Sequence, residues 1–283
     1  MDIALIALDL DGTQLDRQKR LTPRNRRALE RAAAKGIRVV PCTGRFYRGM
    51  PAVIRDLPFV RYVITMNGAE VLDVTRDRPL YRAEIAPSEF EPLFDYMDTL
   101  PVIYDCYQDG WGWMDRRFYD GLEEFMAGQD ELDMATSLRT PVDDFRGTLR
   151  RRNMPIQKTQ MFFRLDDLER RDRELERIAA RFPNLAVSAA IYNNIEINSR
   201  EAQKGRALRE LCAVLGLRPE QAMAFGDGLN DVSMLRDAGV GVAMANASAA
   251  VRAAADRVAP SNEEDGVACV IEELLDGCAG AGA

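Results

Sequence analysis

Histidine is absent from this chain of 283 residues. The absence excludes serine–histidine–aspartate triads, phosphotransfer through histidine and zinc sites with histidine ligands. Acid–base chemistry must therefore depend on carboxylates, lysine, tyrosine or cysteine. Cysteine is scarce as well, and no C-x-x-C pair occurs, so neither a disulfide framework nor a zinc ribbon is indicated. The five cysteines are scattered: Cys42, Cys106, Cys212, Cys269 and Cys278.

Excess positive charge and long apolar runs are also missing. The formal net charge is −7, which argues against a general affinity for nucleic acid or anionic membranes. No segment approaches the roughly 18 consecutive apolar residues that a spanning helix needs. The N-terminus carries Asp2 and no basic region before its apolar run, so a signal peptide is not indicated. We expect a cytoplasmic protein without nucleic-acid or membrane partners, and the composition predicts no particular oligomeric state.

The most informative segment lies at the N-terminus. An apolar run, Ile3–Leu8, ends at Asp9-Leu10-Asp11-Gly12-Thr13. Such a run, bounded by Asp and Gly, is typical of a buried strand in a parallel sheet, and ligands of open α/β sheets bind beyond the carboxyl ends of the strands. Two carboxylates this close repel each other unless a cation holds them, and hard oxygen ligands suit Mg²⁺. A carboxylate can also act as a nucleophile.

Alternating strand and helix patterns flank a different middle region. The length favours two domains, because about 100–200 residues is usual for one. A hairpin signal at 103–114, with an Asp109-Gly110 turn, interrupts the series, so we predict an inserted domain at 84–196 within a core of 1–83 and 197–283. Helices are predicted at 23–35, 45–57, 168–182, 204–215, 230–238 and 267–275, and strands at 3–8, 37–42, 62–66, 161–165, 194–198, 222–225 and 240–244, before a frayed tail at 277–283.

Three further segments carry candidate site residues. Thr43-Gly44-Arg45 follows the second predicted strand, where the start of a helix would seat a phosphate, although Thr43 could equally be an ordinary N-cap. Lys204 opens a predicted helix and could meet a phosphoryl oxygen or be a solvated surface lysine. Gly226-Asp227-Gly228-Leu229-Asn230-Asp231 follows another buried strand and could complete a Mg²⁺ shell. A dinucleotide loop is the weaker interpretation, because the third glycine position holds Asp231.

In this order, the four segments resemble the motifs of the haloacid dehalogenase superfamily of phosphatases. The long insertion resembles the α/β (C2B-type) cap of the Cof-type subgroup, as do the segments Asn194–Ile197 and Ser261–Ala268. The resemblance covers essentially the whole chain. It implies an α/β fold, with a Rossmann-like parallel-sheet core and an inserted α+β cap domain that closes over the site and selects the substrate.

The resemblance also implies residue roles. Asp9 is expected to be the nucleophile, with one oxygen on Mg²⁺. Asp11 is expected to be the general acid and then the base, with its backbone carbonyl on the metal. Because Asp11 must hold a proton at neutral pH, we predict that neighbouring carboxylates raise its pKa. The remaining roles are catalysis by Thr43 and Lys204; phosphate or substrate binding by Thr43, Gly44, Arg45, Asn67, Lys204 and Asn230; metal binding by Asp9, Asp11 and Asp227; and a second metal shell of Asn230 and Asp231.

The expected activity is Mg²⁺-dependent hydrolysis of a small phosphate monoester through an aspartyl-phosphate. A sugar phosphate, pyridoxal phosphate or flavin mononucleotide could each be the substrate. Two alternatives are a phosphomutase of the same superfamily and a non-catalytic sugar-phosphate sensor. A third hypothesis, a thiolate phosphatase, comes from the Cys-x5-Arg spacing of Cys42 and Arg48.

Overall fold

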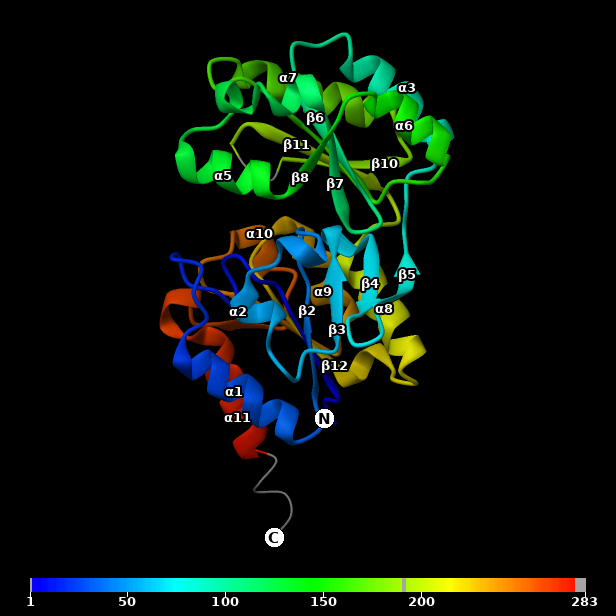
Figure 1. Cartoon of the computed structure of the whole chain (residues 1–283). Helices are drawn as coiled ribbons and strands as arrows, with labels where there is room; N and C mark the ends of the chain where they lie inside the picture. The colour runs from blue at the N-terminus through cyan, green and yellow to red at the C-terminus, as the bar shows by residue number, and fades with distance from the viewer. Residues whose placement is uncertain (1, 190–191, 278–283) are drawn as a thin grey trace. The chain divides into compact units, whose positions relative to one another are not determined.

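The computed structural model describes residues 2–189 and 192–277. Of the tail predicted at 277–283, Gly277 is the last residue of a helix, and the rest, with Cys278, lies outside the described residues. The chain divides into two compact units, which are Met1–Arg82 with Gln203–Ala283, and Ala83–Ala202 (Figure 1). The second unit continues beyond the boundary predicted at 196, so the strand that spans this boundary lies wholly within the second unit. No helix of the described residues is long and apolar enough to cross a membrane.

The first unit contains a parallel sheet and a small antiparallel sheet. Its strands are β1 (Leu5–Leu8), β2 (Arg38–Pro41), β3 (Tyr62–Thr65), β4 (Glu70–Asp73), β5 (Arg78–Arg82), β12 (Ala222–Gly226), β13 (Val240–Met244) and β14 (Arg257–Ala259). Its helices are α1 (Pro23–Ala34), α2 (Ala52–Arg55), α8 (Lys204–Val214), α9 (Val232–Asp237), α10 (Ala249–Arg252) and α11 (Gly266–Gly277). Short 3₁₀ helices are η1 (Tyr47–Gly49), η2 (Met66–Gly68), η4 (Pro219–Gln221), η5 (Leu229–Asp231) and η6 (Asn262–Glu264).

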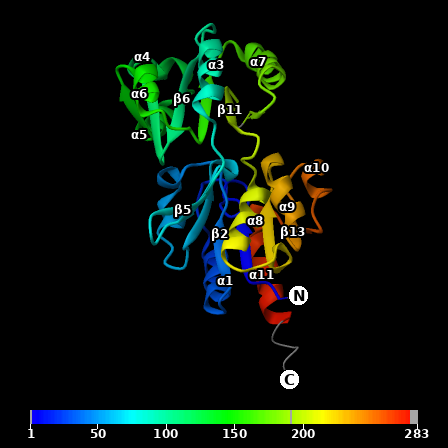
Figure 2. The same ribbon diagram turned by 90° about the vertical axis from the view of Figure 1, so that its right-hand side faces the viewer.

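The parallel sheet has the strand order β14-β13-β12-β1-β2, which places β1 between β12 and β2. Successive side chains of a strand point to opposite faces, so Leu5 and Ala7 pack into one core cluster and Ile6 and Leu8 into another. Helices α1 and α11 lie side by side against the second cluster (Figure 1). Helices α8 and α9 lie next to each other against the first (Figure 2). Burial on both faces explains the continuous apolar run of β1.

The first predicted helix is confirmed, together with its capping. The Thr22 hydroxyl accepts a hydrogen bond from the backbone N–H of Asn25, and Pro23 occupies the first turn. Gly36 ends the helix with a φ of +83°, a conformation that glycine adopts without strain. The predicted stripe of Ala28, Leu29 and Ala32 is buried against the sheet.

The predicted helix at 45–57 is wrong. The structure has only η1 and the single turn α2 there, separated by Met50 and Pro51. Proline has no N–H to donate, and it disfavours the helical conformation in the residue before it, so a helix cannot run through this point. The third predicted strand forms as β3 but pairs antiparallel with β4, outside the main sheet.

The second unit is a mixed sheet of strand order β10-β11-β9-β6-β7-β8 with helices packed on it. Its strands are β6 (Ile103–Gln108), β7 (Trp111–Asp115), β8 (Arg139–Val142), β9 (Lys158–Phe162), β10 (Leu185–Ser188) and β11 (Asn194–Ser199). Its helices are α3 (Pro87–Met97), α4 (Arg116–Tyr119), α5 (Gln129–Ser137), α6 (Phe145–Arg152) and α7 (Leu168–Arg181), with η3 (Leu122–Phe125). The predicted hairpin is confirmed: β6 pairs with β7, and Asp109 and Gly110 turn with φ of 53° and 71°. The predicted fold class, a parallel α/β core with an inserted α+β domain, is therefore confirmed.

Candidate active site

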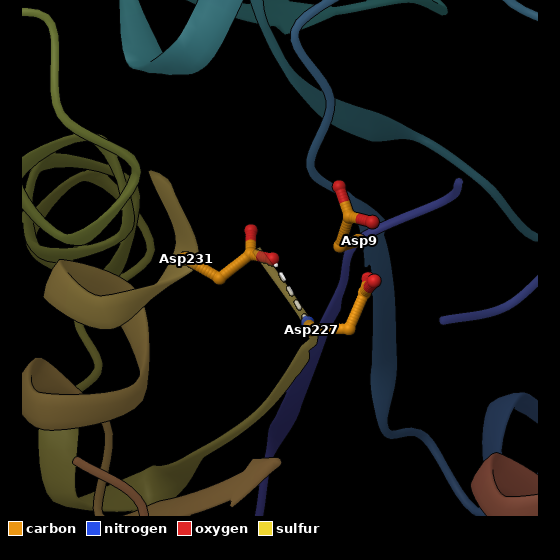
Figure 3. Close-up of side chains that lie close together, drawn as sticks. All are labelled: Asp9, Asp227 and Asp231. Atoms are coloured by element: carbon orange, nitrogen blue, oxygen red, sulfur yellow. Dashed lines mark hydrogen bonds between the residues drawn. The ribbon is translucent and has the colours of Figure 1, made fainter. Parts of the chain in front are cut away.

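Two adjacent strands of the parallel sheet bring Asp9 and Asp227 together. Strand β1 ends at Leu8 opposite Phe225 of β12, and the backbone N–H of Asp9 donates to the carbonyl of Phe225 at 3.0 Å. Asp227 follows β12 directly, so both carboxylates lie at the carboxyl ends of the strands. Carboxylate oxygens of Asp9, Asp227 and Asp231 all lie within 4.8 Å of one another (Figure 3).

Lys204 lies in the interior of this cluster. As the first residue of α8, its side chain is 0% exposed, and its Nζ donates to Asp9 Oδ1 at 2.6 Å and to Asp231 Oδ1 at 2.5 Å. Burial disfavours the charged ammonium, but Asp231 and Asp9 outweigh that effect and raise the pKa of Lys204. The surface-lysine interpretation of this residue is wrong.

Asp231 fixes the loop after β12. Its Oδ2 accepts a hydrogen bond from the backbone N–H of Asp227 at 3.0 Å (Figure 3). The same oxygen accepts from the backbone N–H of Gly228 at 2.9 Å, and Oδ1 accepts from Lys204. A Cβ on Gly226 would lie 2.4 Å from the Cβ of Asp231, so only glycine allows this close approach. Asp231 thus orients Asp227 and Lys204 with both of its oxygens.

The oxygens that remain suit a divalent cation. Within residues 2–189 and 192–277, no hydrogen bond reaches Oδ2 of Asp9, and Oδ2 of Asp227 receives only a long one, 3.5 Å from Asn246. Burial and the charge of Asp231 raise the pKa of Asp9 to about 8, although Lys204 opposes the shift. Burial also raises the pKa of Asp227, with Asp231 adding to the effect. When all three carboxyl groups are ionised, the single ammonium leaves an excess of negative charge, and a hard cation that binds there would take the place of the retained proton.

Asp11 has a different environment from the one we predicted. Its carboxylate accepts two hydrogen bonds from the guanidinium of Arg45, at 3.0 and 3.1 Å, and pairs with Lys19 at 2.7 Å. Burial alone would raise the pKa of Asp11, but Arg45 and Lys19 outweigh burial and lower it. The predicted rise is wrong because cations, and not carboxylates, surround this side chain. The metal contact expected of its backbone carbonyl stays a prediction.

The predicted phosphate-binding residues form a second group beside the carboxylates. The Thr43 hydroxyl accepts from the backbone N–H of Arg45, and the Thr43 carbonyl accepts from that of Asn67. The side chain of Asn230 donates to Oδ1 of Asn67 at 3.1 Å, and a Cβ on Gly44 would lie 2.9 Å from that same oxygen. Since no helix begins at Arg45, the helix-dipole argument for this seat is wrong. The phosphate role of these residues stays a prediction.

Two residues that contact the carboxylate cluster were not among the predicted site residues. The Thr13 hydroxyl donates to Asp227 Oδ1 at 2.8 Å, and the Asn246 amide donates to the carbonyl of Gly12 at 2.9 Å. Thr13 belongs to the first motif, so its position carried a signal. Asn246 follows β13, the neighbour of β12, and placing it required the strand order.

The thiolate hypothesis does not fit the structure. Cys42 is 0% exposed and its Sγ lies 3.4 Å from the carbonyl of Val40. Burial raises the pKa of this thiol far above its usual value, so it stays protonated.

Known proteins are similar to this chain in both sequence and fold. A family model described as haloacid dehalogenase-like hydrolase matches residues 6–271. The chain belongs to this family. The predicted Cof-type subgroup is confirmed as well. A haloacid dehalogenase-like hydrolase of Bacillus subtilis has a solved structure with a TM-score of 0.77 and 28% identity, covering 96% of this chain and 100% of that one.

Curated relatives of this haloacid dehalogenase-like hydrolase extend over nearly the whole chain. A 5-amino-6-(5-phospho-D-ribitylamino)uracil phosphatase of Bacillus subtilis is 29% identical and covers 97% of both chains. A second Bacillus subtilis protein of the same name is 30% identical, over 96% of this chain and 98% of that one. The chain is accordingly a phosphatase, a phosphoric monoester hydrolase that acts on small phosphorylated substrates.

Proposed function

We propose that this hydrolase cleaves a small phosphate monoester by Mg²⁺-dependent transfer of the phosphoryl group to Asp9, followed by hydrolysis of the aspartyl-phosphate. The observation that carries the proposal is the state of Asp9. One of its oxygens is fixed by the buried Lys204, and the other receives no hydrogen bond from the described residues. A carboxylate oriented this way can attack phosphorus, while the ammonium offsets charge on the transferred group.

Mg²⁺ bound by Asp9 and Asp227 would neutralise negative charge on the phosphoryl oxygens. In the first step an oxygen of Asp9 bonds to phosphorus, and the bond from phosphorus to the ester oxygen breaks. The leaving oxygen takes a proton from Asp11. In the second step water attacks phosphorus, Asp11 accepts its proton, and the bond to Asp9 breaks to release inorganic phosphate.

Asp11 must exchange partners before it can donate this proton. Its ion pairs with Arg45 and Lys19 keep it ionised, as the lowered pKa shows. An arriving phosphate dianion is a stronger acceptor for the Arg45 guanidinium than a carboxylate is. We infer that the phosphate group takes over Arg45, that the exposed Lys19 turns away to solvent, and that Asp11 then takes up a proton from water before it donates to the leaving group. Arg45 would thus act in substrate binding, as expected from the sequence.

The names of the relatives suggest one substrate. Several act on a ribitylaminouracil phosphate, a polyol phosphate attached to a ring. We propose the same class, a phosphorylated sugar or polyol, for this chain. A panel for testing therefore contains this compound, common sugar phosphates, pyridoxal phosphate and flavin mononucleotide.

The test is phosphate release from this panel with Mg²⁺ and with excess EDTA, for the wild type, Asp9→Asn and Asp56→Asn. Asp56 is an exposed carboxylate that pairs with its neighbour Arg55, which makes it a matched control. We expect Mg²⁺-dependent release that Asp9→Asn lowers by about 10³-fold or more and that Asp56→Asn leaves unchanged. Metal-independent release, or an isomeric phosphate ester as product, would contradict the proposal; the latter result would favour a mutase.

A further inference from the structure

The segment Ser261–Asp265 contacts the nucleophile loop, residues 9–22 between β1 and α1, at several points. The backbone N–H of Arg17 donates to Glu263 Oε1 at 2.7 Å, and the Thr22 hydroxyl donates to Asp265. The Asn262 side chain donates to the carbonyl of Leu15 at 2.9 Å. This segment lies far from the loop in sequence, and nothing in the proposed chemistry uses it.

Asn246 extends these contacts to the carboxylate cluster. Its amide nitrogen donates to the carbonyl of Gly12 at 2.9 Å and lies 3.5 Å from Asp227 Oδ2. Its amide oxygen accepts from the backbone N–H of Asn262 at 3.1 Å. The side chain therefore bridges the nucleophile loop, a proposed metal ligand and the segment Ser261–Asp265.

The bridge has a rigid support. Asn262 is buried, and both its backbone N–H and its side chain are hydrogen-bonded. The Glu264 carboxylate accepts from both the backbone N–H and the hydroxyl of Ser261, which closes a capping box around η6. A side-chain amide held at its oxygen end has its nitrogen end oriented as well, because the amide is planar.

We propose that Asn246 is a positioning residue that orients Asp227 for the metal, and that Asn262 in turn holds Asn246. Thr13 fixes one oxygen of Asp227, and Asn246 limits the rotation of the other, Oδ2, which is the oxygen left for a cation. The same amide also binds the carbonyl of Gly12. One side chain therefore fixes both the backbone turn after Asp11 and the carboxylate of Asp227. This inference rests on the proposed function, since it presupposes a divalent cation at Asp9 and Asp227.

Residues that orient metal ligands typically change metal affinity by about 10–100-fold when mutated. The Asn246 contact to Asp227 is long, so we expect the lower end of this range. Loss of Asn262 acts through Asn246 and should have a smaller effect in the same direction.

The test is direct binding of Mn²⁺ in the absence of substrate. The concentration of free Mn²⁺ is measured from its electron paramagnetic resonance signal. Asn246→Ala should weaken binding about tenfold. Asn246→Ser should behave alike, because its side chain is too short to reach Gly12. Asn262→Ala should weaken binding about threefold. Gln18→Ala is the matched control, since this amide lies on the loop that Asn246 contacts but, among the described residues, its side chain is hydrogen-bonded to Arg20 alone. Thermal melting of each variant confirms that it is folded.

The outcomes separate the two proposals. Wild-type protein that binds Mn²⁺, with unchanged affinity in both Asn246 variants, overturns the positioning role and leaves the proposed function standing. Wild-type protein that binds no Mn²⁺, or binds it equally well after Asp9→Asn, contradicts the proposed function and the positioning role together. Weakened binding in the Asn246 variants, with normal binding in Gln18→Ala, supports the inference.

Discussion

The stability of the metal-free protein should fall as the pH rises from about 5 to about 8. Asp9 has a pKa of about 8 in the folded chain, because of burial and the charge of Asp231. In the unfolded chain its pKa returns to about 3.9. Between these values the native state binds more protons than the unfolded state, so the free energy of unfolding decreases with increasing pH. The contribution is fully present below pH 4 and is lost by about pH 8.

The magnitude follows from the one proton that Asp9 retains. A single proton gives a slope of at most about 1.4 kcal/mol per pH unit. The pKa of about 8 already includes the opposing charge of Lys204, so we expect a slope near this limit in the middle of the range. Histidine is the one side chain whose unperturbed pKa lies between pH 5 and pH 8. Since the chain has no histidine, only groups with shifted pKa values contribute to the slope in this range.

The assay is urea unfolding of EDTA-treated protein at several pH values, compared with Asp9→Asn. The variant cannot ionise at this position, so its slope should be shallower than that of the wild type, and what remains comes from other buried carboxyl groups such as Asp227. Saturating Mg²⁺ should stabilise the wild type most at the high end of the range, where it replaces the proton. A wild-type slope equal to that of Asp9→Asn would refute the reasoning about the carboxylate cluster.

Three other substitutions test the packing of the site. Lys204→Met leaves two buried carboxylates without their cation and should lower the free energy of unfolding by about 3–5 kcal/mol in urea titrations, whereas Lys35→Met at the surface should cost under about 1 kcal/mol. Gly12→Ala places a Cβ 2.3 Å from Asp227 Oδ2 at a φ of +92°, so the Mg²⁺ concentration for half-maximal activity should rise about tenfold or more. Cys42→Ser should keep activity within about threefold in the same phosphate assay, because the thiol is buried and protonated; a loss of 10²-fold would revive the thiolate hypothesis.

Local signals in the sequence predicted much of the core. The apolar run before Asp9 and the one before Asp227 each predicted a buried strand with a carboxylate at its end. Such predictions succeed because the spacing of apolar residues and the Asp and Gly residues that end a run are local features of the sequence. The Thr22-Pro23 start of α1 and the Asp109-Gly110 turn were predictable for the same reason. The helix expected at 45–57 failed although its breaker, Pro51, was visible in the sequence.

The environment of Asp11 could not be predicted in this way. Lys19 reaches it through a local turn in which the lysine has a φ of 59°, and Arg45 reaches it only because β2 lies beside β1. The place of Asn246 depends likewise on the order of β12 and β13 in the sheet. Motif order predicted that Asp9, Asp227 and Lys204 would lie close together, but the partners of Asp11 and Asn246 depend on the tertiary structure.

The central claim is that Asp9 takes the phosphoryl group. It is tested most directly by acid-quenching the enzyme during turnover with Mg²⁺ and measuring the mass of the proteolytic peptide that contains Asp9. The account predicts that this peptide gains the mass of one phosphoryl group, and that the same peptide of Asp9→Asn does not. A wild-type peptide that stays unmodified under rapid turnover, or a phosphoryl group on another peptide, would contradict it.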